Sequence, residues 1–393
     1  MNAGGLSRLT GGIPGEEIDR LLMLVVGALL SLGLLMVLSA SITAADRDMG
    51  APFYYLFRQS AYLGAGLVAG LLCMRIPMRF WERSSVLLLV AAYLLLIAVL
   101  IPGIGREVNG STRWLPLGPV NLQVSEPARL LILMFVAAYV ARRSEELATT
   151  AIGFLKPVGV VVFAVGLLLL EPDFGAATVL LATSMAVLFA GGVRIRHFLA
   201  LLVPAAAGLV LLALASPYRL RRLVGFLDPW ADPYDTGFQL TQSLIAIGRG
   251  EIAGVGLGSS VQKLFYLPEA HTDFVFAVFA EEFGLLGVIL LLTLYCVLVW
   301  RVLAVSSRCA GEGSLFSACL TFGLGVWLGA QAMINIGVNM GLLPTKGLTL
   351  PLVSFGGSSL IVCCAAIGII LRADLESRRV ANRPATRRRR VRR

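Results

Sequence analysis

An acidic side chain stands directly before a long apolar run in the segment His271-Thr272-Asp273-Phe274. A carboxylate at the edge of a membrane is partly desolvated, which raises its pKa and makes it a better proton acceptor near neutral pH. Asp273 is therefore a candidate general base, and His271 is a rival for the same role. The simpler explanation is that Thr272 or Asp273 caps the following helix by accepting hydrogen bonds from the free amides of its first turn.

A second acidic position, Glu126, begins another apolar run after Gln123-Val124-Ser125. An acidic residue suits the first turn of a helix, and Pro127 is tolerated there, so local structure alone explains the position. Alternatively, Glu126 lines a polar cavity, because acidic groups in or beside a membrane are costly unless they are paired or hydrated. Such a cavity suits a sugar, or a divalent cation such as Mg²⁺ or Mn²⁺ that bridges phosphates. The other carboxylates of this kind are Glu171, Asp173, Glu281 and Glu282.

Basic side chains gather in the loops that hold these acids. Arginine and lysine bind pyrophosphate well, so one explanation is an anionic substrate. The other explanation is ordinary solvated loop charge. The basic residues in question are Arg106, Arg113, Arg219, Arg221, Arg222, Lys263 and Lys346.

Two small-residue segments accompany the charged ones. The run Gly254-Val255-Gly256-Leu257-Gly258 lacks the preceding strand of a dinucleotide fingerprint, so we interpret it as a flexible or close-packed loop whose amides could contact phosphate. The segment from Leu343 to Ser359 contains two prolines, paired glycines and small hydroxyls, including Ser354 and Ser358. It predicts a bent loop and close helix approach, and its hydroxyls are candidate substrate contacts.

Membrane helices are the elements that must position these residues. Of 393 residues, 58% are hydrophobic and 14% charged, whereas soluble domains average roughly 45–50% and about 25%. At roughly 20 apolar residues per crossing, the sequence predicts an all-α, polytopic membrane protein of about ten helices. The predicted spans are 21–44, 54–74, 84–102, 126–141, 154–170, 175–193, 197–216, 276–300, 315–338 and 353–371.

The basic residues of the short loops predict the orientation, because such residues favour the cytoplasmic side. Four short loops and the Arg-rich tail, residues 372–393, fall on one side. With an even number of spans, both this tail and the N-terminal segment 1–20 are expected in the cytoplasm. The tail suits anionic lipid headgroups better than nucleic acid, since it follows the last apolar run directly.

The opposite face receives a large loop, residues 217–274, between the seventh and eighth spans of the membrane domain, residues 21–371. Within this loop the apolar pattern of 234–250 predicts a short amphipathic or re-entrant helix. His197 and His271 are the only histidines, so they provide no zinc-like cluster. The six cysteines avoid the long outer loop, so no disulfide framework is expected.

Several of these stretches together resemble the SEDS family (shape, elongation, division and sporulation). The likeness covers nearly the whole bundle in the expected order, and the wording of Pro344 to Pro351 is similar to the division branch rather than the elongation branch. Two departures are Val124, where the family commonly has proline, and Phe355, where tyrosine is usual. The matching segments are 171–175, 237–243, 254–260, 269–274, 281–284, 335–339 and 343–359.

The resemblance implies a peptidoglycan glycosyltransferase that polymerises lipid II into β-1,4 glycan strands during septal wall synthesis. It implies the bacterial inner membrane at the division septum, with an extracytoplasmic active site. Asp273 corresponds to the family's essential aspartate and would remove the acceptor proton, while basic residues or a divalent ion offset the charge of the leaving pyrophosphate. The expected substrate-binding residues are Arg113, Glu126, Lys263, His271, Lys346, Ser354 and Ser358.

The same resemblance implies a set of partners and no tightly bound cofactor. The expected partners are lipid II, undecaprenyl pyrophosphate, a class B penicillin-binding protein, divisome activator proteins and membrane lipids, without nucleic acid. Two other functions fit a bundle with outer cations and buried carboxylates: a lipid II flippase, or a noncatalytic divisome scaffold. The concentration of polar residues at the outer end favours the enzyme.

Overall fold

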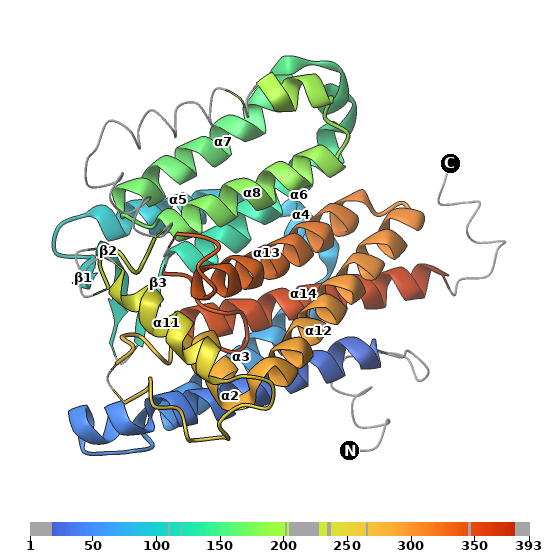
Figure 1. Cartoon of the computed structure of the whole chain (residues 1–393). Coiled ribbons are helices and arrows are strands. Elements are labelled where there is room, and N and C mark those ends of the chain that lie inside the picture. Colours follow the sequence, from blue (N-terminus) through green and yellow to red (C-terminus); the bar gives the residue numbers. More distant parts are fainter. Residues whose placement is uncertain are drawn as a thin grey trace.

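The computed structural model describes residues 18–108, 111–118, 120–200, 203, 228–233, 237–264, 266–344 and 347–381. Long helices run side by side and make up most of this part of the chain (Figure 1). They are α2 (Arg20–Met49), α3 (Tyr54–Arg75), α5 (Ser85–Leu100), α6 (Ser125–Thr149), α7 (Ala151–Leu170), α8 (Phe174–Ala190), α12 (Val275–Gly311), α13 (Leu315–Asn339) and α14 (Gly357–Ala381). Two shorter helices are α4 (Met78–Arg83) and α11 (Phe238–Arg249).

Each predicted span that lies within the described residues coincides with one of these long helices. The seventh, 197–216, lies mostly outside them, although residues 195–200 and 203 are helical. Several helices run further than predicted: α2 continues to Met49, α6 to Thr149, α12 to Gly311, and α14 to Ala381, into the Arg-rich segment. The predicted helical membrane fold is therefore confirmed, while the number of spans stays a prediction.

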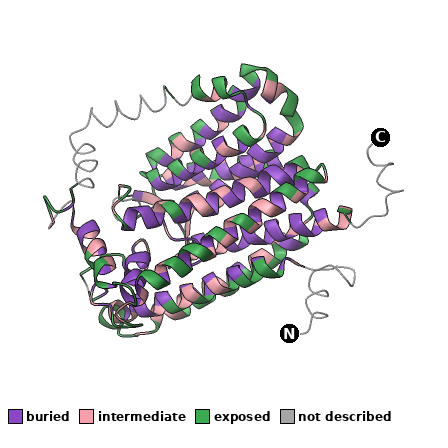
Figure 2. Cartoon of the chain, turned by 45° about the vertical axis from the view of Figure 1, so that its right-hand side comes forward, coloured by how far each residue is buried: buried purple, intermediate pink, exposed green. Residues whose placement is uncertain are grey.

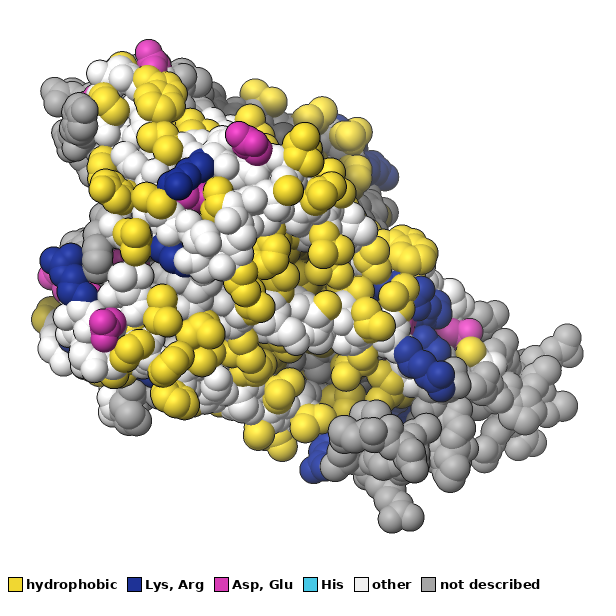
Figure 3. Space-filling view, turned by 60° about the horizontal axis from the view of Figure 1, so that its bottom comes forward, with side chains coloured by type: hydrophobic (Ala, Val, Ile, Leu, Met, Phe, Trp, Pro, Cys, Tyr) yellow, Lys and Arg dark blue, Asp and Glu magenta, His cyan; other side chains and the backbone are white. Residues whose placement is uncertain are grey.

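The outer surface of the bundle is apolar, as a membrane protein requires. Phe57, Leu87 and Leu170 are 72%, 71% and 69% exposed, which would be costly in water. Among the described residues, six helices are long and apolar enough to cross a membrane, namely α2, α3, α7, α12, α13 and α14. On the face in Figure 3, hydrophobic side chains spread over the middle and most charged ones lie toward the ends.

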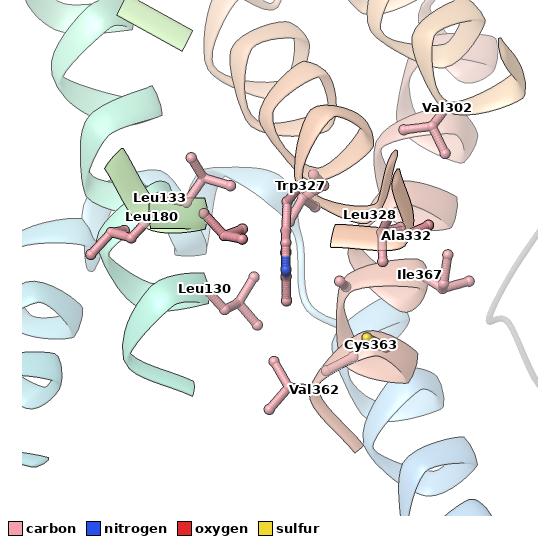
Figure 4. Close-up of a cluster of buried hydrophobic side chains, with 14 of the residues drawn as sticks. Leu130, Leu133, Leu180, Val302, Trp327, Leu328, Ala332, Val362, Cys363 and Ile367 are labelled. Carbon is pink, nitrogen blue, oxygen red and sulfur yellow. The ribbon is translucent and has the colours of Figure 1, made fainter. Parts of the chain in front are cut away.

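The core lies around α13 and α14, where most residues are buried (Figure 2). The fully buried Trp327 of α13 packs between Leu130 and Leu133 of α6 and Val362 and Cys363 of α14 (Figure 4). Its indole nitrogen donates to Gln331 Oε1 at 2.7 Å, so the ring is held without an unsatisfied polar group.

Helices α3 and α14 approach so closely that only glycine fits between them. A Cβ atom on Gly368 would lie 2.1 Å from the carbonyl oxygen of Gly70, and one on Gly70 would lie 2.8 Å from that of Cys364. Small residues permit such backbone contacts where helices pack inside a membrane. This packing fixes the start of α3 against the turn that leads into α14.

A three-stranded antiparallel sheet closes one end of the bundle, in a stretch that the sequence analysis treats as loop. It consists of β1 (Arg106–Val108), β2 (Ser111–Leu117) and β3 (Val120–Gln123), in that order (Figure 1). The amide of Val124 donates to the carbonyl of Arg113 at 3.3 Å and so extends the β2–β3 ladder. A proline at position 124 has no N–H and could not make this bond.

The predicted amphipathic helix in the large loop is confirmed as α11, which packs against α12. Leu240 and Ala246 are buried while Ile245 is exposed. The hydroxyl of Ser243 donates to the carbonyl of Asn339 at 2.8 Å, which ties the loop to the end of α13.

The glycine run after α11 is close-packed at Gly254, which fits against a break in α12, whereas Gly256 and Gly258 are exposed. Gly284 interrupts that helix with φ 63° and ψ −163°. The freed amides of Leu285 and Leu286 donate to the carbonyls of Glu251 and Ile252 at 2.9 and 3.1 Å. A Cβ atom on Gly284 would lie 2.4 Å from the amide nitrogen of Gly254, so the break requires glycine.

Candidate active site

Asp273 lies at the sheet end of the bundle, in the two residues that precede α12. Its backbone carbonyl accepts hydrogen bonds from the side-chain amides of Asn335 and Asn339 of α13, at 2.9 and 3.0 Å. Asn335 also donates to the carbonyl of Leu348, and the oxygen of Asn339 accepts from the amide of Ala277. The two asparagines therefore join the base of α12, the end of α13 and the loop before α14 around this one residue.

The carboxylate of Asp273 is not used to cap α12. The residue before the first turn is Phe274, without a side-chain cap, and the hydroxyl of Thr272 donates instead to the carboxylate of Glu269 at 2.7 Å. The carboxylate of Asp273 makes no hydrogen bond or ion pair with any residue that the structure describes. The capping explanation is therefore wrong, and this acid is left available for chemistry.

Arg113 of β2 approaches Asp273 across the backbone of Gly347. A Cβ atom on this glycine would lie 3.4 Å from Oδ2 of Asp273 and 3.8 Å from Nη1 of Arg113. Gly347 thus lies between a carboxylate and a guanidinium, both within van der Waals distance of the position that a Cβ atom would take. These are the two predicted site residues that the structure most clearly brings together.

The surroundings of Asp273 raise the pKa of its carboxyl to about 7, chiefly through burial. The negative charges of Glu269 and Asp173 raise this pKa further, and the positive charge of Arg113 lowers it. A carboxyl group with this pKa is a substantial proton acceptor at neutral pH and still releases the proton afterwards.

His271, the rival base, is packed among aromatic rings. Its ring lies 4.6 Å from that of Tyr55 and 5.4 Å from that of Phe355, between centroids. Burial lowers the pKa of the imidazole below its usual value, against the opposing effect of Glu269. A neutral, stacked imidazole is better placed to shape the site than to carry charge in it.

Asp173 starts α8 and ties it to the sheet. One carboxylate oxygen accepts from the amide of Ala176 at 3.0 Å, as a helix cap. The other accepts from the hydroxyl of Ser125 at 2.9 Å and from the side chain of Gln123 at 3.4 Å. Its oxygens are thereby committed to positioning the starts of α6 and α8.

Glu171 is fully buried, and both of its carboxyl oxygens lack a partner among the described residues. Burial first and Asp173 second raise the pKa of this carboxyl to about 8, while Arg113 lowers it. The group is therefore mostly protonated at neutral pH, which reduces the cost of its burial.

Glu126 is buried and forms an ion pair with Arg129, one turn further along α6. The guanidinium of Arg129 also lies over the ring of Trp327, with its carbon 4.5 Å from the ring centroid. Since Glu126 is 4% exposed, its carboxylate is part of the bundle interior. Its substrate contact stays a prediction.

Lys263 is buried away from the carboxylate of Asp273, in a cluster beside the break in α12. Its ammonium donates to Glu282 at 2.9 Å and to Ser39 at 3.1 Å. The neighbouring Glu281 accepts from the hydroxyl of Ser260. The structure thus gives Lys263 a carboxylate partner of its own, and its predicted contact with pyrophosphate stays untested.

The hydroxyls of the two predicted serines bond to backbone groups. Ser354 accepts from the amide of Leu350 at 2.8 Å, and its carbonyl accepts from Gln59 at 3.2 Å. Ser358 accepts from the amide of Gln123 at 2.9 Å, which joins α14 to β3. Both hydroxyls shape the loop around the site.

Lys346 lies outside the described residues, as do Arg219, Arg221 and Arg222, so their roles stay predictions. Within the described ranges, no three His, Cys, Asp or Glu side chains form a group that could hold a metal ion.

Three residues that the structure makes prominent were not predicted as site residues, although segment 335–339 is among those that resemble the SEDS family. Asn335 and Asn339 lie four residues apart, on one face of α13, and Arg129 lies three residues after Glu126. Polar side chains inside an apolar helix at these spacings are the signal that could have identified them.

Comparison with known proteins decides the family. A model of the cell cycle proteins FtsW, RodA and SpoVE matches residues 19–379. The chain belongs to this family. The resemblance to the SEDS family that the sequence motifs indicate is thereby confirmed.

Relatives within the FtsW/RodA/SpoVE family match over nearly their whole length. One is a probable peptidoglycan glycosyltransferase FtsW of Thioalkalivibrio sulfidiphilus, 55% identical over 92% of this chain and 90% of the relative. Another protein of the same name, from Coxiella burnetii, is 52% identical over 91% of this chain and 96% of the relative.

Solved structures of this family share the fold. The rod shape determining protein RodA of Thermus thermophilus has a TM-score of 0.67 and 31% identity, over 92% of this chain and 98% of that one. A chain from a peptidoglycan synthase complex, solved to explain how polymerization and crosslinking are coordinated, has a TM-score of 0.73 and 33% identity. It matches 93% of this chain and 99% of its own length.

Proposed function

We propose that the chain is a peptidoglycan glycosyltransferase that polymerises lipid II into β-1,4 glycan strands for septal wall synthesis in cell division. The observation that carries this proposal is the carboxylate of Asp273, which is without a described partner and lies beside Gly347 together with the guanidinium of Arg113. The high identity to proteins named FtsW, against 31% for RodA, supports division over elongation.

The proposed reaction is a single inverting displacement. The 4-hydroxyl of one lipid II attacks the anomeric carbon of a glycan strand carried on undecaprenyl pyrophosphate. The new bond joins this oxygen to the anomeric carbon, and the bond from that carbon to the pyrophosphate oxygen breaks. An α-linked donor thus gives a β-1,4 product. Asp273 takes the proton of the hydroxyl and later returns it to water.

Arg113 is the residue that we assign to the leaving pyrophosphate. As the bond to the anomeric carbon breaks, negative charge builds up on the pyrophosphate, and a fixed guanidinium nearby stabilises it. Arg113 also favours the ionised form of Asp273. One side chain therefore assists both the proton acceptor and the departing group.

The proposed orientation puts the Asp273 end outside the inner membrane and the opposite end in the cytoplasm. Basic residues gather at that opposite end, where Arg301 and Arg378 pair with the buried Asp19 and Arg308 pairs with Asp374. This charge pattern supports the assignment. A class B penicillin-binding protein would supply crosslinking, and divisome activators would switch the pair on at the septum.

A polymerisation assay tests the proposed function. The purified chain, with its cognate transpeptidase and with moenomycin to block other glycosyltransferases, receives labelled lipid II, and glycan products are separated on a gel. We expect glycan ladders. Transfer of lipid II between vesicle leaflets without ladders would instead indicate a flippase, and stimulation of the transpeptidase alone would indicate a scaffold.

The pH dependence of polymerisation should follow the carboxyl of Asp273. Only the ionised form accepts a proton, so the rate should rise as pH increases through about 7 and level off above it. In Glu269→Gln a neighbouring negative charge is lost, so the pKa of Asp273 falls and the rise moves to lower pH. Initial rates between pH 5 and 9 measure both curves. If the rate of Glu269→Gln rises at the same pH as that of the native chain, the pH dependence does not come from Asp273.

Asn339 should affect the rate rather than substrate affinity. Asn339→Ala removes the hydrogen bonds to the carbonyl of Asp273 and to the amide of Ala277. A shift of the base by a fraction of an ångström should lower kcat about 10-fold or more, with little change in KM. Asn121→Ala, on the neighbouring strand β3, serves as the control. A loss of thermal stability with full kcat would assign Asn339 to folding alone.

A further inference from the structure

Arg58 stands on the membrane helix α3 without an acidic partner. Its guanidinium donates to the hydroxyl of Tyr54 at 3.0 Å and to that of Tyr62 at 2.8 Å. These are its hydrogen-bond partners among the residues that the structure describes. An arginine near the end of a membrane helix, held by neutral groups alone, is a candidate for binding an anionic ligand.

The buried cations of the described bundle are neutralised by carboxylates, unlike the half-buried Arg58. Arg129 pairs with Glu126, and Lys263 pairs with Glu282. The tyrosine hydroxyls around Arg58 are neutral, so they fix the direction of the guanidinium and leave its charge uncompensated. Two of its five N–H groups are used by the hydroxyls, and the others remain for a ligand.

The surroundings of Arg58 connect it to the Asp273 end of the bundle. The ring of Tyr54 lies 5.3 Å from that of Tyr55, which in turn lies 4.6 Å from His271, two residues before Asp273. On the other side, a Cβ atom on Gly357 would lie 2.8 Å from the ring of Tyr62, so this ring rests on the start of α14. Ring contacts thus link the frame of Arg58 to the segment that carries the candidate base.

We propose that Arg58, framed by Tyr54 and Tyr62, binds the pyrophosphate of the lipid-linked saccharide that acts as acceptor. This inference rests on the proposed function, in which two lipid-linked pyrophosphates meet at one base. Arg113 faces Asp273 across Gly347, and in the proposed function it meets the leaving pyrophosphate. The acceptor's pyrophosphate is separated from its attacking hydroxyl by the saccharide, so it requires a second cation set apart from the base.

The chemistry of the frame suits this ligand. Pyrophosphate carries several negative charges and many acceptor oxygens, and arginine binds such groups through charge-assisted hydrogen bonds. The position of Arg58 in the second turn of α3 lies where a lipid headgroup would meet the membrane surface. The apolar remainder of α3, including the exposed Leu67, Val68 and Leu71, offers a surface for the polyprenyl chain.

Binding of undecaprenyl pyrophosphate tests the site without any turnover. The full-length protein in nanodiscs is titrated with labelled undecaprenyl pyrophosphate, and Arg58→Gln is compared with Arg47→Gln, which removes an exposed charge at the same end. We expect Arg58→Gln to weaken binding about 10- to 100-fold and Arg47→Gln to leave it unchanged. Arg58→Lys keeps the charge and should lose less. Thermal unfolding confirms that each variant is folded.

Two comparisons make the outcome decisive. The affinity for undecaprenyl monophosphate should fall less in Arg58→Gln than the affinity for the pyrophosphate does. Lipid II polymerisation by this variant should show a raised KM with kcat nearly unchanged. Equal pyrophosphate affinity in the native chain and Arg58→Gln overturns the proposal. The proposal is also overturned if Arg58→Gln loses affinity for phosphatidylglycerol alone, because Arg58 would then bind phospholipid headgroups. A native chain that makes no glycan ladders but binds pyrophosphate through Arg58 refutes the proposed function and retains the site.

Discussion

Replacing Asp273 with asparagine should abolish glycan polymerisation while leaving the protein folded. Asparagine has nearly the same shape as aspartate and cannot accept the acceptor's proton, so we expect the rate to fall by about 10²–10⁴-fold. The fold should survive because Asn335 and Asn339 hold the backbone carbonyl of residue 273 and not its carboxylate. Ladder formation from labelled lipid II measures the rate, and thermal unfolding measures the stability.

Glu269→Gln is the matched control for this result. It removes another carboxylate of the same loop, one that is exposed and bonded to Thr272. At pH 8 or above, where the native base is already mostly ionised, this variant should polymerise at nearly the native rate. Native ladders from Asp273→Asn would remove Asp273 from the mechanism altogether.

The second large effect concerns the buried pair of Glu126 and Arg129. In Glu126→Gln the buried guanidinium loses its counter-charge, and we expect the free energy of unfolding to fall by about 3–5 kcal/mol. Replacing both members by apolar residues of similar volume, as in Glu126→Leu with Arg129→Met, should restore most of this loss. Thermal unfolding in detergent compares the native, single-variant and double-variant proteins.

A double variant as unstable as Glu126→Gln would contradict the assignment of an ion pair, since it would show that the loss has another cause. Polymerisation by the stable double variant then tests the predicted substrate contact of Glu126. Turnover that stays low supports the contact, and full turnover excludes it. The double variant also lacks the guanidinium over the ring of Trp327, so its turnover is compared with that of Arg129→Met alone.

The helices could be predicted from the sequence because one physical rule determines them. A backbone in lipid must satisfy its own hydrogen bonds, so apolar runs of sufficient length become helices. The start of α12 after Asp273 and the amphipathic α11 follow from the same pattern. Local pattern does not reveal the break at Gly284, because it depends on a distant loop that supplies the missing hydrogen-bond partners.

The site was only partly predictable, because sequence shows residue types and not their partners. Asp273 and Arg113 were identified by type and position, and the structure brings them together beside Gly347. Lys263 was predicted as another cation that contacts the substrate. The structure instead bonds its ammonium to Glu282 and Ser39, which lie on other elements and which no local pattern indicates.

The sheet that carries Arg113 was missed although the sequence offered a signal. Asn109-Gly110 is the dipeptide that most strongly favours a tight hairpin, and it lies between the residues of β1 and β2. The strands of this sheet are short, so the alternation of apolar and polar side chains is a weak signal in them. The pairing of Trp114 with Gln123 then determines where Arg113 lies.

The most direct test of the account is a structure of Asp273→Asn with lipid II bound. The variant should bind its substrate without consuming it. We expect the side-chain amide of residue 273 to lie within hydrogen-bond distance, about 2.6–3.2 Å, of the 4-hydroxyl of the acceptor saccharide. A 4-hydroxyl that instead contacts another carboxylate, with residue 273 out of reach, would contradict the assignment of Asp273 as the base.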